Sequence, residues 1–145
     1  MNALEELEKI LLNEAKVEGK CESLIRLNSL AEKVTAAMNG ETVSGSTDPD
    51  KMGNNLVKKE KLKLELVMVQ DEYERHRDFM SGIVDRLKNP VSIKILYGLY
   101  FNGKELKEVS NEIGYSYRHT QDLRDVAVQD VQKILDEIEK SHMIS

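Results

Sequence analysis

The stretch "NEIGYSYRHTQDLRD", from Asn111 to Asp125, interrupts one helical pattern and starts another within a few residues. Gly114 can adopt the left-handed backbone conformation that a tight turn between two helices requires. Ser116 is a favourable N-cap for a helix that starts at Tyr117. The stretch therefore predicts a helix-turn-helix, in which a short break positions the start of the second helix.

Side chains around this break fit two helices that approach each other closely. Ser110 is a small residue four positions before Gly114, and Tyr115 is expected to fill the turn with its ring. We expect Thr120 to be partly buried where the helices meet, with its hydroxyl bonded to a carbonyl one turn back. In such motifs the N-terminal part of the second helix enters the major groove of DNA. The alternative is a simple pair of packed helices, because helical hairpins of this kind are common.

The break belongs to an expected unit of three helices, residues 89–145. Asn89 is predicted to cap the first of these helices, with Pro90 as its first residue. A turn, "FNGK", follows, and Asn102 with Glu105 resembles a capping box for the second helix. The apolar residues of the three helices are Ile93, Leu96, Tyr97 and Tyr100, then Leu106, Val109 and Ile113, and finally Leu123, Val126, Ala127, Val131, Ile134, Leu135 and Ile138.

Residues 1–88 are expected to form an antiparallel helical hairpin with a flexible loop over residues 40–53. The loop is rich in Gly, Ser, Thr, Asp and Pro, which bury little surface. The second helix, residues 54–88, has the unbroken 4-3 spacing of a coiled-coil seam, which needs the other helix or a second chain as its partner. The apolar positions of the first helix are Leu4, Leu7, Ile10, Val17, Cys21, Leu24, Leu27, Ala31, Val34 and Met38. The seam of the second is Leu62, Leu66, Val69, Tyr73, His76, Met80, Ile83 and Leu87.

Residue types that carry catalysis or bind metals are scattered along the chain. We interpret His76 as a histidine that reaches solvent from the edge of the core, rather than as a pH or metal switch. The three His and single Cys are too dispersed for a zinc site, and the chain has no Gly-rich phosphate loop. The Ser residues lack a paired His and acid in a convincing context. We therefore expect neither enzymatic activity nor a cofactor.

The composition is that of an acidic, helical protein. The 145 residues include 21 basic and 26 acidic side chains, giving a formal net charge of −5, which counts against strong non-specific DNA binding. The single cysteine, Cys21, excludes an internal disulfide and fits a reducing compartment. The sequence shows neither the pattern of a signal peptide nor an apolar run of about 18 residues. We expect a cytoplasmic protein without membrane contact.

Two segments carry a resemblance to known proteins: "ESLIRLNSLAEKVTAAM" and "LKNPVSIKILYGLYFNGKELKEVSNEIGYSYRHTQDLRDVAVQDVQKIL". With the link between them, they resemble a family of small prophage and mobile-element proteins of Gram-positive bacteria. The C-terminal segment is similar to region four of sigma factors and to phage transcription regulators of the ArpU and RinA kind, most specifically in "IGYS" followed by "RH". The resemblance implies a coiled-coil N-terminal half and a DNA-binding or transcription-linked C-terminal half. The chain departs from the family pattern at Thr120, and at Leu99 and Asp122 it lacks a usual positive charge.

The preferred hypothesis is an all-α, phage- or prophage-type transcriptional regulator that binds the major groove of double-stranded DNA. The coiled coil would mediate homo-oligomerisation or contact with a partner. The alternative is an interaction protein that docks on RNA polymerase or another protein without binding DNA. The candidate DNA-facing residues that the resemblance implies are Ser116, Tyr117, Arg118, His119 and Gln121. Spacing alone adds Lys104 and Lys107 as phosphate contacts, and the basic Arg124 completes the set.

Overall fold

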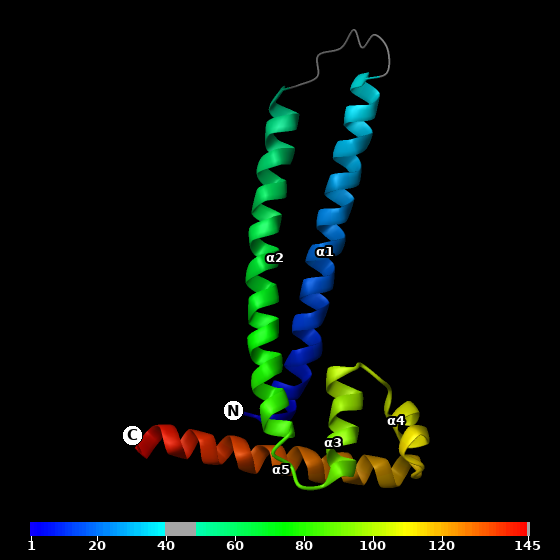
Figure 1. Cartoon of the computed structure of the whole chain (residues 1–145), viewed down its shortest axis with the longest axis vertical. Helices are drawn as coiled ribbons and strands as arrows, with labels where there is room; N and C mark the ends of the chain where they lie inside the picture. Colours follow the sequence, from blue (N-terminus) through cyan, green and yellow to red (C-terminus); the bar gives the residue numbers. More distant parts are fainter. Residues whose placement is uncertain (40–48, 145) are drawn as a thin grey trace. The chain divides into compact units, whose positions relative to one another are not determined.

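The computed structural model describes residues 1–39 and 49–144, and every regular element within these ranges is a helix (Figure 1). The fold is therefore all-α, as predicted. The elements are α1 (Ala3–Asn39), α2 (Pro49–Val84), α3 (Pro90–Leu96), a π-helical turn η1 (Tyr97–Phe101), α4 (Leu106–Ile113) and α5 (Tyr117–Ile144). They divide into two compact units, Met1–Asn13 with Tyr73–Ser145, and Glu14–Glu72. None of the described helices is long and apolar enough to cross a membrane.

The bounds of α2 differ from the prediction at both ends. The helix already starts at Pro49, within the predicted loop, because proline is tolerated in the first turn of a helix. Residues 40–48 of that loop lie outside the described residues. At its other end α2 stops at Val84, and a tighter turn follows in which the Leu87 amide donates to the Val84 carbonyl at 3.0 Å. The chain can then take the extended conformation of Asn89, whose side chain accepts from the Val91 amide at 2.9 Å.

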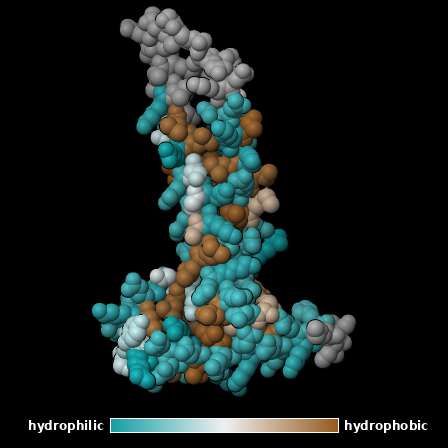
Figure 2. All heavy atoms as spheres, turned by 180° about the vertical axis from the view of Figure 1, so that it is seen from behind, coloured by the Kyte–Doolittle hydropathy of each residue, from teal (hydrophilic) through white to brown (hydrophobic). Residues whose placement is uncertain are grey.

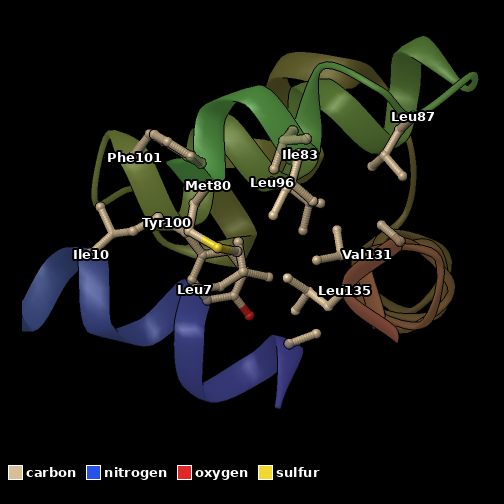
Figure 3. Close-up of a cluster of buried hydrophobic side chains, with 13 residues drawn as sticks. Leu7, Ile10, Met80, Ile83, Leu87, Leu96, Tyr100, Phe101, Val131 and Leu135 are labelled. Carbon is tan, nitrogen blue, oxygen red and sulfur yellow. The ribbon is translucent and has the colours of Figure 1, made fainter. Parts of the chain in front are cut away.

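The core of the first unit is formed by helices from both ends of the chain. Figure 3 shows side chains of α1, α2, the α3–η1 segment and α5 converging on one another. This unit therefore crosses the boundary that we predicted at residue 88, because the apolar faces of α3 and α5 are covered by the start of α1 and the end of α2. The buried apolar side chains of this cluster are Ala3, Leu7, Ile10, Met80, Ile83, Val84, Leu87, Leu96, Tyr100, Phe101, Ala127, Val131 and Leu135.

The predicted seam of α2 is buried to different depths along its length. Met80 and Ile83 are fully buried in the core of the first unit. In the second unit, Leu62 and Leu66 are only half-buried, where α1 and α2 lie side by side (Figure 1). On α1, Leu4 is 43 % exposed, contrary to its predicted place in the apolar face. The side chains of three further predicted positions, Ala31, Val34 and Met38, lie outside the described residues.

His76 is more buried than our interpretation of a side chain that reaches solvent required. Its side chain is only 11 % exposed, and Nε2 lies 2.7 Å from the Glu6 carbonyl oxygen. Nδ1 lies 3.6 Å from the carboxylate of the same residue. The start of α1 covers His76 in the folded chain, which spacing within α2 could not reveal. His76 therefore forms a polar contact between the start of α1 and the C-terminal part of α2.

Two contacts attach the α3–η1 segment to its neighbours. The Tyr97 hydroxyl donates to Asp85 Oδ1 at 2.6 Å, and the Ser81 hydroxyl lies 2.7 Å from it on α2. Burial and the hydrogen bond to Asp85 raise the pKa of Tyr97. On the other side, Gly98 lies so close to Val109 that an added Cβ would be 2.9 Å from a valine methyl group. The absence of a side chain at Gly98 therefore lets α4 pack directly on η1.

The predicted capping box before α4 is absent. The helix begins at Leu106 with Glu105 as its N-cap residue, and the Glu105 side chain makes no capping hydrogen bond. Asn102 instead ends η1, where its backbone amide donates to the Tyr97 carbonyl at 3.0 Å. The π-helical turn extends the preceding helix to Phe101, so Asn102 caps the C-terminus of η1 and not the N-terminus of α4. Gly103 then reverses the chain with a positive φ of 66°.

Candidate nucleic-acid interface

The turn between α4 and α5 is closed by backbone hydrogen bonds to a single carbonyl. Gly114 has φ 76° and ψ 22°, the left-handed conformation predicted for it. The amides of Gly114 and Tyr115 donate to the Ser110 carbonyl at 3.0 and 3.1 Å. Ser110 is buried, and its hydroxyl donates to the Lys107 carbonyl at 2.7 Å. The small, internally bonded Ser110 side chain thus fits where α4 meets its neighbours.

The start of α5 is fixed by Ser116 and Thr120. The Ser116 hydroxyl accepts a hydrogen bond from the His119 amide at 3.1 Å, which confirms the predicted N-cap. The Ser116 carbonyl accepts both the amide and the hydroxyl of Thr120, at 2.9 and 2.8 Å. Thr120 is fully buried, deeper than the partial burial that we predicted. This pair of residues holds the first turn of α5 in one register against the rest of the unit.

That register turns one side of the first α5 turns toward solvent. Tyr117, Arg118 and Gln121 are all exposed, and helical spacing places them within about 100° of one another. The buried side of the helix continues from Thr120 through Ala127, Val131 and Leu135. Val126, which we predicted to belong to the apolar stripe, is 51 % exposed instead. We refer below to the side chains of Tyr117, Arg118 and Gln121 as the α5 reading face.

Two of the predicted basic residues, Lys104 and Arg124, are engaged in ion pairs with acidic side chains of the chain itself. Lys104 Nζ binds both carboxylate oxygens of Glu112 at 2.9 and 3.0 Å, and this hydrogen bonding raises the pKa of Lys104. Arg124 is half-buried and donates through Nε and Nη2 to Asp125 Oδ1, at 3.3 and 3.2 Å. Both cations are thereby partly compensated within the chain, which spacing along α5 did not indicate.

The remaining predicted positions are exposed but lie on different surfaces. Lys107 is exposed on α4. His119 points away from the α5 reading face and packs against the Tyr115 ring, edge to face, with centroids 5.0 Å apart. Tyr115 is itself 42 % exposed, so it does not fill the turn as we predicted. The hydrogen bonds to the Ser110 carbonyl already close the turn, and the Tyr115 ring instead contacts the His119 ring.

The charge of the α5 reading face changes sign after its first turn. Asp122 and Asp125 are exposed, one helical turn after Arg118 and Gln121 respectively. Coulombic attraction to a phosphate is therefore confined to the N-terminal end of α5, where the helix dipole also favours anions. These two acids make contact between a polyanion and the whole length of α5 unfavourable. A contact with a polyanion would therefore be limited to the N-terminal end of α5.

No pattern in the sequence indicated a groove that lies close to the turn between α4 and α5. It has a volume of about 360 Å³ and runs between the α3–η1 segment and α4. The lining contains two cations, Lys94 and Lys104, and one acid, Glu112, which binds Lys104. The groove exists because Gly98 allows α4 to approach η1, a contact between residues that no local pattern connects. Its lining residues are Val91, Lys94, Tyr97, Gly98, Asn102, Lys104, Val109, Glu112 and Ile113.

Comparisons with other proteins add no relative to this geometry: no protein-family model, curated protein or solved structure matches the chain. Within the described ranges, no group of three or more His, Cys, Asp or Glu side chains could hold a metal ion. The chemical capacity of the site therefore follows from its own residues, which are hydrogen-bond donors and acceptors on an exposed helix start.

Proposed function

We propose that this chain is a phage- or prophage-type transcriptional regulator that binds double-stranded DNA through the start of α5. The observation that carries the proposal is that Thr120 is fully buried while Arg118, on nearly the opposite side of the helix, and Gln121, about 100° away, are exposed. A helix end that is rigidly held and carries exposed hydrogen-bonding side chains has the properties needed to read base edges. The proposal assigns no catalytic step to the chain.

Each side chain of the α5 reading face has a role in this proposal. The Arg118 guanidinium can donate two hydrogen bonds to guanine, or clamp a phosphate, and the Gln121 amide can pair with adenine. The Tyr117 ring and hydroxyl suit a contact with sugar or phosphate. In this proposal, the exposed Lys107 on α4 contacts the phosphate backbone of the DNA and adds a contact that does not depend on base sequence.

The test is a DNA-binding titration with the full chain and DNA from around its own gene, repeated over a salt series. We expect affinity for a specific site to fall steeply with salt. Arg118→Ala with Gln121→Ala should reduce specific affinity by roughly 2–6 kcal/mol if both side chains read bases, at about 1–3 kcal/mol for each contact. The melting temperature should stay nearly unchanged, because both side chains are exposed.

A matched control is available on the same helix. Gln129 and Lys133 are also an exposed amide and an exposed cation, three turns further along α5. The double change Gln129→Ala with Lys133→Ala should retain most of the specific affinity. If both double variants weaken binding equally, the interaction is a diffuse electrostatic one and the α5 reading face is not its centre.

The second candidate is an interaction protein that docks on RNA polymerase or another protein. Asp122 and Asp125 beside the reading face, together with the ion-paired Lys104 and Arg124, favour it because they reduce the attraction to phosphates. Under this alternative the wild type binds DNA from its own promoter no better than random DNA at near-physiological salt, while it co-purifies with RNA polymerase. That combination of results would remove the DNA-reading proposal.

A further inference from the structure

Within Glu14–Glu72, α2 carries apolar residues on two opposite sides. The inner side contains the half-buried seam residues Leu62 and Leu66. Leu64 lies two residues from each of them, and hence about 200° around the helix. It belongs to an outer set that also contains Val57, Val67 and Met68, all four between 62 and 67 % exposed. We call this set the outer α2 face.

The outer α2 face has the pattern of a second coiled-coil seam. Val57, Leu64 and Met68 are separated by seven and four residues, the spacing that keeps side chains on one line of a supercoiled helix. A helix side that faces only water is normally polar, so a line of large apolar side chains indicates a contact surface. In the space-filling view, apolar side chains interrupt the charged surface along the long helices (Figure 2).

Charges on α2 are distributed so that the helix is complementary to an antiparallel copy of itself. Four lysines lie before the centre of the outer α2 face, at positions 58, 59, 61 and 63, with one acid among them, Glu60, which pairs with Lys63. Two acids, Asp71 and Glu72, follow the centre. Glu65 sits between the two groups, and its charge is compensated by Lys20 at 2.9 Å. Reversing the second copy places the basic end of one helix beside the acidic end of the other.

We propose that the partner of the outer α2 face is a second copy of this chain, packed antiparallel about a two-fold axis at the level of residue 66. Residues 64 and 68 are equally distant from that level, so Leu64 faces Met68 of the partner subunit and the reverse. Residues 61 and 71 are also equally distant, so Lys61 faces Asp71 of the partner subunit. Two central apolar layers are thus flanked by two layers of opposite charge, a self-complementary arrangement of the kind that a two-fold interface requires.

This proposal goes beyond the proposed function and does not depend on it. Self-association through the outer α2 face requires no DNA, and it leaves the inner seam to contacts within one chain. The experiment is therefore carried out on the full chain without DNA, by sedimentation equilibrium. If no dimer forms, the proposal that α5 binds DNA is unaffected. If DNA binding is not found, the proposal of a dimer is unaffected.

The register can be tested by charge reversal. Lys61→Glu places a carboxylate opposite Asp71 of the partner subunit, and Asp71→Lys places a cation opposite Lys61 of the partner subunit. Each single variant should weaken self-association by roughly a hundredfold, because like charges that face each other across an interface repel. An equimolar mixture of the two variants should recover the association, because both charge layers are then complementary. The double variant Lys61→Glu with Asp71→Lys should also recover it.

Two further variants guard against indirect effects. Lys16→Glu reverses an exposed charge on α1 and should leave self-association unchanged. Leu64→Lys should abolish it without loss of helix content, because the side chain is exposed in the single chain. A wild type that sediments as a monomer up to its solubility limit would overturn the proposal. So would single charge variants that associate like the wild type, or that fail to recombine when mixed.

Discussion

The two compact units bury their side chains to very different depths, although α1 and α2 run through both. In Met1–Asn13 and Tyr73–Ser145, residues such as Leu7, Ile10 and Met80 are completely inaccessible to solvent. In Glu14–Glu72, none of the side chains whose burial is described is fully buried. Two helices side by side shield each other on one side only, whereas α3, η1 and α5 add further layers in the first unit. A regular seam therefore fixes which side of a helix is buried, whereas additional helices decide how deeply it is buried.

The largest effect is expected from a charge in the core of the first unit. Met80→Asp would bury a carboxylate at a position with no solvent access, at a cost of roughly 4 kcal/mol or more. Thermal melting followed by circular dichroism measures it. Gln70→Asp introduces the same group at an exposed position of α2 and should change stability by about 0.5 kcal/mol or less. Equal melting temperatures for the two variants would remove the contrast between core and surface.

A second test concerns the α4–α5 contact in the same unit. Thr120→Asp should cost about 3 kcal/mol, because it places a charge at a fully buried site. Thr120→Val should lie within about 1.5 kcal/mol of the wild type, because the Ser116 carbonyl keeps its bond from the Thr120 amide at 2.9 Å when the hydroxyl is lost. Chemical denaturation of both variants gives these values. A tolerated aspartate would mean that this face of α5 is open to water.

A pair of glycines distinguishes tight packing from open space. Gly98→Ala directs a methyl group against Val109 at 2.9 Å, and we expect a net loss of about 1–2 kcal/mol from overpacking. Gly82→Ala on α2 meets no atom within 4 Å and should stabilise the chain by about 0.5–1 kcal/mol through helix propensity alone. The sign of the change in melting temperature is the measurement. Stabilisation by both alanines would show that α4 can move away from η1 at little cost.

The smallest effect is expected in the two-helix unit. The hydrogen bond from Lys20, 2.9 Å from Glu65 Oε2, lowers the pKa of Glu65. A lowered pKa means that the pair stabilises the folded state above the ordinary pKa of a glutamate and that this contribution is lost as the pH falls through the folded value. Lys20→Met should return the pKa of Glu65 toward its ordinary range, as followed by NMR titration of the carboxyl carbon. Both side chains are more than a third exposed, so the melting temperature should barely change. An unshifted titration in the variant would show that the ion pair is not maintained in solution.

Local features of the fold were predictable because they depend on residues a few positions apart. The cap at Asn89, the left-handed Gly114, the cap at Ser116 and the Thr120 hydrogen bond all follow from interactions within one helical turn. The exposure of Tyr117, Arg118 and Gln121 could be derived in the same way, since fixing one buried residue of a helix fixes the orientation of the others, but Val126 was wrongly assigned to the apolar stripe. The capping box at Asn102 failed because a π-helical turn, unrelated to any sequence pattern, shifted the end of the preceding helix.

From the amino-acid sequence alone, the helical class of this protein, the starts of α3 and α5, and the exposure of Tyr117, Arg118 and Gln121 could be predicted. The tertiary structure alone decided that α1 and α2 contribute to the same core as α5, that Glu6 covers His76, and that Glu112 engages Lys104. The physical reason is the range of the interactions involved. Capping and helical periodicity act over about four residues, whereas burial and ion pairing depend on which distant surfaces meet when the chain folds.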